Sequence, residues 1–178
     1  MHLRLSSDSV VSDRAQQLAA LSEGRARMVM ARALNHTGNK ARTAVRRGLV
    51  KQTSAPRAAV VAGVTSQGAA TRGLGAIAYT ISAKAKPLPL RLFRPRQDGT
   101  GVKARVWGRQ KQYSSAFIVQ SLAGNVFRRR GASRLPIRVL FGPSLATELV
   151  KDESRAAFLR VSRDLPQRVD HELSRVLK

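Results

Sequence analysis

Apolar residues recur at helical spacing through the first third of the chain, and the pattern changes to alternation further on. Residues 8–36 contain no proline and are rich in Ala, Leu, Met and Arg, which predicts a long helix. The stretch NHTGNK then predicts a break or kink at Gly38 and Asn39. Helical spacing resumes at Ala41 and predicts a second helical stretch to about Val50.

A short helix and a series of strands are predicted to follow. In TSAPRAAVV, Ser54 is the expected N-cap and Pro56 lies in the expected first turn. From about Leu74 polar and apolar residues alternate, which is typical of strands. We expect two prolines to place PLPLRLF at a sheet edge, because proline lacks the N–H that a β-ladder needs. The predicted strands are GAIAYTISA, PLPLRLF, VKARVWG, AFIVQ, NVFRRR and PIRVLF.

Aromatic and basic residues are interleaved in this predicted sheet. The alternation in VKARVWG places Lys103, Arg105 and Trp107 on the face opposite its three apolar residues. Together with Tyr113 and Phe127, Trp107 would suit a stacking platform for single-stranded nucleic acid. We favour the alternative that these aromatic residues are core or interface residues, because aromatic side chains on strands usually pack against neighbours.

Helical spacing returns after the predicted sheet. The segment GPSLATELVK opens a terminal helical region, and apolar residues from Leu165 to Val176 repeat at helical spacing. We therefore expect an α+β fold in a single domain. Its expected parts are an N-terminal helical arm (1–52), an antiparallel sheet of about five to six strands (74–142) and C-terminal helices packed on the sheet (144–178), within one domain of residues 1–178.

The net charge is the most informative feature of the amino-acid composition. The 178 residues hold 33 Lys and Arg against ten Asp and Glu, a net charge of +23, and their 43% hydrophobic fraction suffices for a core. Between Arg25 and Thr147 there are 24 basic residues and a single acid, Asp98. A solvated surface usually mixes both signs, so this imbalance favours contact with a polyanion or an acidic protein surface.

Two basic clusters supply the candidate contact residues. One follows the outer face of the second helical stretch, and the other is the run of three arginines in NVFRRR. Strand alternation places Arg128 and Arg130 on one face and Arg129 with Phe127 on the other, which is typical of a strand that presents charge at a sheet edge. The candidate contacts are Arg42, Arg46, Arg47, Lys51, Arg128, Arg129 and Arg130.

The sequence offers no set of catalytic or metal-binding residues. His2, His36 and His171 are far apart, and the chain has no cysteine. Asp152 and Glu153 are adjacent, but at the start of a predicted helix they favour the helix dipole. We therefore expect no enzymatic activity, no metal and no cofactor. The start of the chain lacks the apolar stretch of a signal peptide and the run AAVVAGV is too short to span a bilayer, so we expect no membrane partner.

Five short motifs resemble one protein family in their order and spacing. They are AVRRGLVKQTSAP, VWGRQK, SAFIVQ, NVFRRRG and RLPIRVLFGPSL, and they resemble the minor tail protein Z family of long-tailed bacteriophages and prophages. The resemblance runs from about Ala44 to the C-terminus and is densest between Val106 and Leu145. The motif residues are Trp107, Gly108, Ala116, Phe117, Ile118, Phe127, Arg129, Pro136, Ile137, Gly142 and Pro143.

The resemblance implies a structural virion protein, made in the bacterial host cytoplasm, that completes the tail at or near its head-proximal end. Proteins of this kind commonly form rings matched to the sixfold tail tube. The implied partners are further copies of the chain, the tail tube, head-closure or terminator proteins of the neck, and genomic DNA in the channel. No catalytic residue is implied, because the motif positions are mostly Gly, Pro and aromatic residues that suit turns and a core framework.

Two other classes of protein are alternatives to a tail-completion protein. A standalone basic nucleic-acid-binding protein, associated with the nucleoid or the ribosome, explains the net charge equally well. It does not explain the aromatic-rich sheet or the order of the five motifs. A nuclease or hydrolase lacks a ligand set. We therefore expect a tail-completion protein whose basic surface faces DNA or an acidic neck or tail protein.

Overall fold

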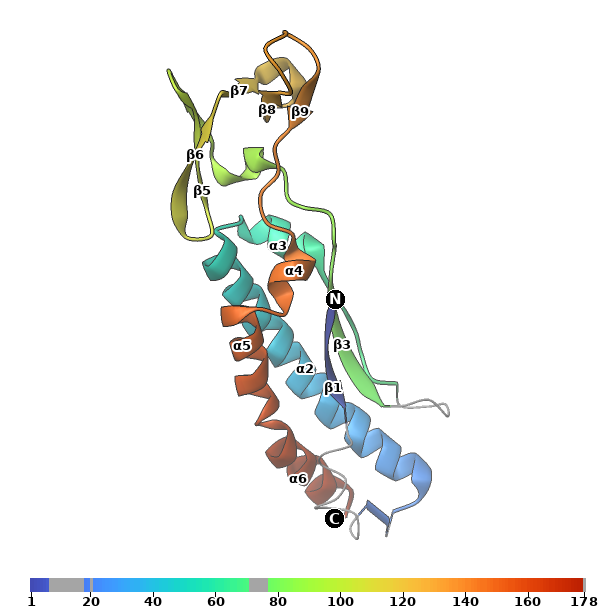
Figure 1. Cartoon of the computed structure of the whole chain (residues 1–178). Coiled ribbons are helices and arrows are strands. Elements are labelled where there is room, and N and C mark those ends of the chain that lie inside the picture. Colours follow the sequence, from blue (N-terminus) through green and yellow to red (C-terminus); the bar gives the residue numbers. More distant parts are fainter. Residues whose placement is uncertain (7–17, 20, 71–76, 178) are drawn as a thin grey trace.

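The computed structural model describes residues 1–6, 18, 19, 21–70 and 77–177. Its architecture is α+β, as the sequence predicts, and it is drawn out along one long helix (Figure 1). The helices are α2 (Glu23–Thr53), α3 (Arg57–Gly63), α4 (Leu145–Leu149), α5 (Asp152–Ser162) and α6 (Leu165–Val176), with the 3-10 helices η1 (Leu90–Phe93) and η2 (Gln120–Leu122). The strands are β1 (His2–Ser6), β2 (Val64–Gln67), β3 (Ala78–Ala83), β4 (Arg96–Asp98), β5 (Gly101–Val106), β6 (Arg109–Ser114), β7 (Ala116–Val119), β8 (Asn125–Arg129) and β9 (Ile137–Val139).

The helix α2 is uninterrupted, so the predicted break at Gly38 and Asn39 is wrong. Gly38 is buried under the ring of Tyr79, and a Cβ atom on Gly38 would lie 2.3 Å from that ring. The Tyr79 hydroxyl also donates a hydrogen bond to Asn39 Oδ1 at 2.9 Å. The glycine therefore serves a close contact with β3 and does not end the helix. Residues 8–17 and 20 of the predicted first helix lie outside the described residues, and α2 begins at Glu23.

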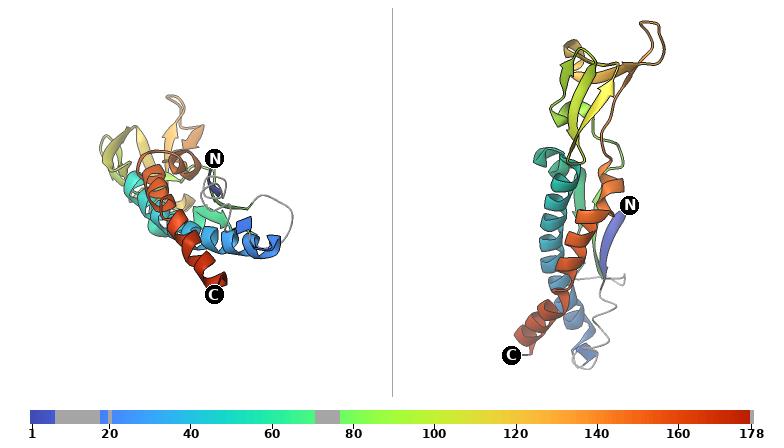
Figure 2. Two further views of the ribbon diagram at one scale, coloured as in Figure 1. Left: turned by 90° about the horizontal axis from the view of Figure 1, so that it is seen from below. Right: turned by 60° about the vertical axis from the view of Figure 1, so that its left-hand side comes forward.

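The elements around α2 form the part of the molecule that we call the body: α2, α3, the sheet β1–β3–β2, and α4 to α6. Helices α5 and α6 run along α2, and β1 and β3 lie beside it (Figures 1 and 2). The C-terminal helices thus pack mainly on α2, while α4 contacts β3 and β1. Although α2 has 31 residues, no helix in the described ranges is apolar over the length that a bilayer crossing requires.

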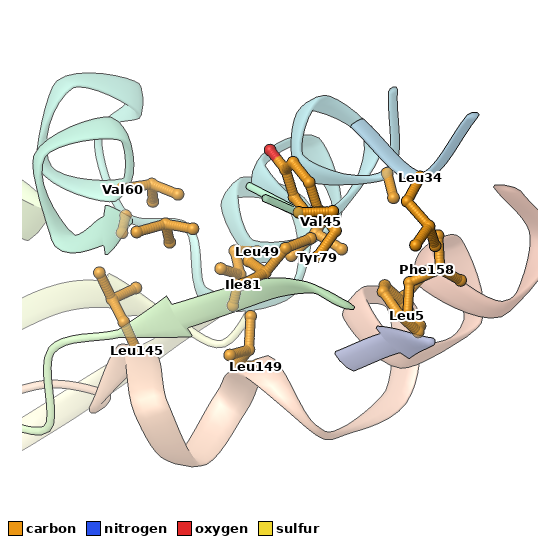
Figure 3. Packing of buried hydrophobic residues seen from close by; sticks show 14 of the residues in the cluster. Leu5, Leu34, Val45, Leu49, Val60, Tyr79, Ile81, Leu145, Leu149 and Phe158 are labelled. Atoms are coloured by element: carbon orange, nitrogen blue, oxygen red, sulfur yellow. The ribbon is translucent and has the colours of Figure 1, made fainter. Parts of the chain in front are cut away.

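The core of the body is built from apolar side chains that converge from helices and strands (Figure 3). Leu34, Val45 and Leu49 of α2 are fully buried, in line with the helical spacing of the sequence. Burying a leucine of this size contributes about 1.5–3 kcal/mol. The other labelled residues of this core are Leu5, Val60, Tyr79, Ile81, Leu145, Leu149 and Phe158.

The strand content differs from the single sheet of about five to six strands that the sequence predicts. Within the described residues, nine strands form three antiparallel sheets of three strands, ordered β1–β3–β2, β4–β5–β6 and β7–β8–β9. The predicted strand PLPLRLF is wrong, because Leu90–Phe93 form η1 and Pro89 only bridges Phe141. The strands β1, β2, β4 and β6 were not predicted; β6 reads RQKQYS, and its polar residues give no apolar alternation.

Residues 90–141, which we call the head, contain η1, η2 and the second and third sheets at one end of the molecule (Figures 1 and 2). The predicted alternation of β5 is confirmed, because its three apolar residues are buried while Lys103 and Arg105 are exposed. Tyr113 and Phe127 are also buried, which confirms their interpretation as packing residues. Trp107 belongs to the β5–β6 turn, and its side chain is 41% exposed.

The chain crosses between body and head in two antiparallel segments, at about residues 84–89 and 141–144. The Leu88 N–H donates to the Pro143 carbonyl at 3.0 Å, and the Gly142 N–H donates to the Leu88 carbonyl at 2.7 Å. Gly142 also lies against the ring of Phe93, 2.7 Å from where its Cβ would be. These contacts leave little room for a side chain at residue 142, so the motif glycine fixes the crossing.

Candidate interaction surface

The head lacks internal neutralisation of its charge. Residues 90–141, all of which are described, hold twelve Lys and Arg and one acid, Asp98. The Asp98 carboxylate accepts hydrogen bonds from Lys103 Nζ at 2.8 Å and from the Thr100 N–H and hydroxyl at 2.9 and 2.8 Å. These bonds, the one from Lys103 above all, hold the pKa of Asp98 well below its ordinary value. The one carboxylate of the head is therefore bound by the neighbouring strand β5 and by its own turn.

Two hollows adjoin at β4; the first opens on the head beside Ser54 and Pro56 of the body, and the second opens on the head alone. The first has a volume of about 740 Å³, and the second one of about 880 Å³. Gln97 and Asp98 line both hollows, so the two are neighbours across one strand. The basic residues of the first are Arg94, Arg96, Lys103 and Arg105, and those of the second are Arg128, Arg129 and Arg130.

Two of the candidate arginines on α2 are bound to neighbouring elements of the body. Arg42 Nη1 donates to Ser66 Oγ at 3.0 Å, and Arg46 Nη2 donates to the Val64 carbonyl at 2.6 Å. Burial, and secondly the charge of Arg42, lower the pKa of Arg46. Both guanidinium groups therefore fasten α2 to β2, a local role that the sequence pattern did not indicate.

The other two candidates on α2 face solvent. Lys51 Nζ forms an ion pair with Glu153 at 2.7 Å, but both side chains are at least half exposed, so the pair contributes little to stability. Arg47 is exposed and lines a small hollow between α2 and α3. Of the four candidate contact residues on α2, Arg47 is thus the one whose charge is directed outward with no ion pair among the described residues.

The arginine run at the end of β8 follows the predicted alternation. Arg129 lies over the Phe117 ring at 5.5 Å, on the face of Phe127, whose ring stacks on Phe117 at 6.3 Å. Arg128 is on the opposite face, half-buried, and its Nε has no hydrogen-bond partner among the described residues. Arg130 is exposed beyond the strand. This run lies in the head and the α2 cluster in the body, so the structure does not bring the two predicted clusters together (Figure 1).

A two-residue turn, Trp107–Gly108, docks the head onto the body. Both residues have positive φ, 52° and 73°, which is typical of a type I′ hairpin turn. The Trp107 N–H donates to the Thr53 carbonyl at 3.1 Å, and the Gly108 N–H donates to Ser54 Oγ at 3.0 Å. The expectation that Ser54 caps the short helix is wrong: Ser54 ends α2 in the left-handed region, and Pro56 precedes α3.

A buried carboxylate completes this junction. Glu148 of α4 is 8% exposed, and it accepts hydrogen bonds from Trp107 Nε1 at 3.2 Å and from Gln52 Nε2 at 2.7 Å. Gln52 Oε1 in turn accepts from the Ser154 hydroxyl at 3.1 Å. These residues were not predicted from the sequence, although an isolated glutamate in the apolar stretch LATELV is a signal for a buried polar contact.

A comparison with known protein families identifies the family of this chain. Residues 11–178 match the family model described as prophage minor tail protein Z (GPZ). The chain belongs to the prophage minor tail protein Z family. Neither the curated proteins nor the solved structures contain a match to this Z-family protein. The matched region begins at residue 11, upstream of the motifs that carry the resemblance.

Family membership makes the chain a structural protein of a phage tail and a component of the virion. In this Z-family protein five of the motif residues lie at turns and at the crossing between head and body, and the other six lie on strands of the head. Trp107 and Gly108 form the docking turn, Gly142 and Pro143 lie at the chain crossing, and the Pro136 carbonyl accepts from the Arg130 N–H at 3.1 Å. Ala116, Phe117, Ile118, Phe127, Arg129 and Ile137 belong to the β7–β8–β9 sheet. Among the described residues, no three His, Cys, Asp or Glu side chains are grouped to hold a metal ion.

Proposed function

We propose that this Z-family protein completes the phage tail at or near its head-proximal end. In this proposal it acts as one subunit of an oligomeric ring, made in the host cytoplasm, and the basic head faces DNA or acidic proteins of the neck and tail. The observation that carries the proposal is the uncompensated charge of the head: twelve cations accompany one carboxylate, which is already bound by Lys103 and Thr100. Such a surface needs an anionic partner when copies assemble.

The distribution of acidic residues supports an oriented subunit. The described acids outside the head are Glu23 at the start of α2 and six residues on or next to α4, α5 and α6. The body therefore mixes both signs, whereas the head does not. A subunit with such different ends is suited to contact two kinds of neighbour, with the mixed surface against protein and the basic end against a polyanion.

Assembly into a ring increases the positive charge that must be neutralised. Six copies at +23 each would carry +138. Self-repulsion of this size opposes assembly unless DNA or acidic tail and neck proteins neutralise it. The proposal places this sixfold ring at the neck, because the head-proximal end of the tail is where genomic DNA meets the tail channel.

Deleting the gene from an inducible prophage tests the proposal. We expect tails that do not join to phage capsids and do not become infectious particles. The wild-type gene supplied in trans should restore infectivity. Quantitative mass spectrometry against the tail-tube protein should give a fixed copy number in multiples that fit a ring. Normal numbers of infectious particles without the gene would refute the proposal. Protein found on the nucleoid but absent from purified particles would favour a standalone nucleic-acid-binding protein instead.

A further inference from the structure

We propose that the two hollows of the head form one continuous track for the phosphodiester backbone of DNA, with β4 along its middle. This inference deepens the proposed function and rests on it, because it selects DNA as the partner of the basic head. Gln97 and Asp98 of β4 line both hollows, so a single strand joins the basic residues on either side. The basic residues of this track are Arg94, Arg96, Lys103, Arg105, Arg128, Arg129 and Arg130.

The outer face of the β4–β5–β6 sheet is a surface of hydrogen-bond donors. Register places Arg96 opposite Lys103, Lys103 opposite Gln112, and Arg105 opposite Gln110. All five side chains are exposed, because the apolar residues of β5 point to the other face. Guanidinium, ammonium and amide donors in rows are the groups that contact DNA phosphates. The amides add hydrogen bonds that a purely ionic surface would lack.

Like charges face each other across strands at both ends of the track. Arg96 lies directly opposite Lys103, and Arg128 directly opposite Arg138. Such pairs repel each other in the free protein. Asp98 neutralises Lys103 but not Arg96, and Arg128 Nε has no partner among the described residues. A phosphate between the members of each pair would remove the repulsion.

The composition of the track favours DNA over an acidic protein. The head has four exposed large apolar side chains, Trp107, Leu122, Leu135 and Phe141, and none of them lines either hollow; the large apolar residues that do, Leu92, Phe93 and Phe117, are buried or half-buried. Protein–protein interfaces have an apolar centre in which charged residues are depleted. Phosphate contact needs no such centre and carries no sequence information. We therefore expect binding that is strong at low salt and independent of DNA sequence.

The track is tested by measuring how the affinity of the full-length protein for two DNA duplexes of unrelated sequence depends on salt concentration. The double variants R96Q/R105Q and R129Q/R130Q each remove two cations, and R155Q/R163Q removes two exposed arginines of the body as a matched control. Each track variant should reduce the slope of log K against log salt by about 1.8. From 50 to 200 mM salt the wild type should therefore lose about twelve-fold more affinity than either variant. Thermal unfolding of each variant checks that its fold is intact.

Five results decide the outcome. Equal slope changes in both track variants, additive in the quadruple variant and absent in the control, support one continuous track. A change in only one track variant overturns continuity, and equal changes in the control overturn the assignment to the head. The conservative variant R96K/R105K should keep the wild-type slope, and a lost slope would contradict a phosphate role. Poly-glutamate that competes as well as DNA would assign the surface to an acidic protein.

The test is separable from that of the proposed function. Particles that assemble normally without the gene would refute tail completion whatever the DNA affinity of the purified chain. Conversely, a chain required for infectious particles whose DNA binding is unaffected by R96Q/R105Q would refute the track and leave tail completion standing.

Discussion

Substituting Glu148 by alanine should loosen the head from the body. The variant removes the acceptor shared by Gln52 and Trp107, at 2.7 and 3.2 Å. The Gln52 bond is short and goes to a buried carboxylate, so its loss should cost about 1.5–3 kcal/mol. The Trp107 bond is longer and its side chain is 41% exposed, so we assign it about 0.5–1 kcal/mol. The free energy of unfolding should fall by about 2–4 kcal/mol in total, which lowers Tm by about 4–16 °C for a chain of this size.

Two measurements check this prediction. Thermal unfolding followed by circular dichroism gives the loss of stability, with Glu153→Ala as the control because that carboxylate is exposed and its loss should leave Tm nearly unchanged. The chain has no native cysteine, so a label pair introduced at Ser121 in the head and Arg163 in the body is unique. Its distance distribution, measured by spin-label spectroscopy, should broaden in Glu148→Ala because one of the contacts that orients the head is gone.

A double-mutant cycle provides the refuting result. Trp107→Phe keeps an aromatic ring but removes the indole N–H, so Glu148→Ala should cost less in that background by the value of the shared bond. Strict additivity of the two substitutions, together with an unchanged distance distribution in Glu148→Ala, would show that the carboxylate does not join head and body.

Two further predictions concern the body and the head separately. Gly38→Ala gains about 1 kcal/mol of helix propensity but must displace the buried Tyr79 ring, which costs about 1–3 kcal/mol, so we expect a net loss in Tm. The control Gly24→Ala has open space around its Cβ and should raise Tm. A change of the same sign in both variants would contradict the contact between Gly38 and Tyr79. In the head, Lys103→Met should raise the pKa of Asp98 measured by NMR titration. Since folding lowers the pKa of Asp98, its contribution to stability is complete above the unfolded-state pKa and is lost as pH falls toward the lowered value, and this loss should be smaller in Lys103→Met.

Periodicity alone predicted β5 and, as two separate stretches, the helical residues of α2, because both elements bury an apolar stripe that leaves a regular pattern in the sequence. It failed where a long-range contact decides the local structure. Gly38 reads as a helix break until Tyr79, 41 residues later in the chain, is seen to occupy the space of its missing side chain. It also failed for β6, whose RQKQYS has one buried residue, Tyr113, and gains its strand conformation from pairing with β5.

The candidate site was predictable in its chemistry but not in its geometry. The count of charges located the basic region, yet it could not separate arginines that hold the body together from those that face outward. Arg42 and Arg46 donate to groups on β2, which no spacing rule indicates. Arg96 and Arg105 gain significance only when antiparallel register sets them in rows with Lys103 and two glutamines.

The family motif VWG shows how the framework and the charged surface depend on each other. A tryptophan in the left-handed region costs about 1 kcal/mol relative to glycine, so its place in the β5–β6 turn requires compensation from its contacts. Hydrogen bonds to Thr53 and Glu148 supply it, and the adjacent Gly108 binds Ser54. These bonds hold one end of β5 on the body, and the same strand carries Lys103 and Arg105 on its outer face. The orientation of the basic track is therefore set by uncharged motif residues, which explains why a charge-bearing surface is specified by a motif of aromatic and glycine residues.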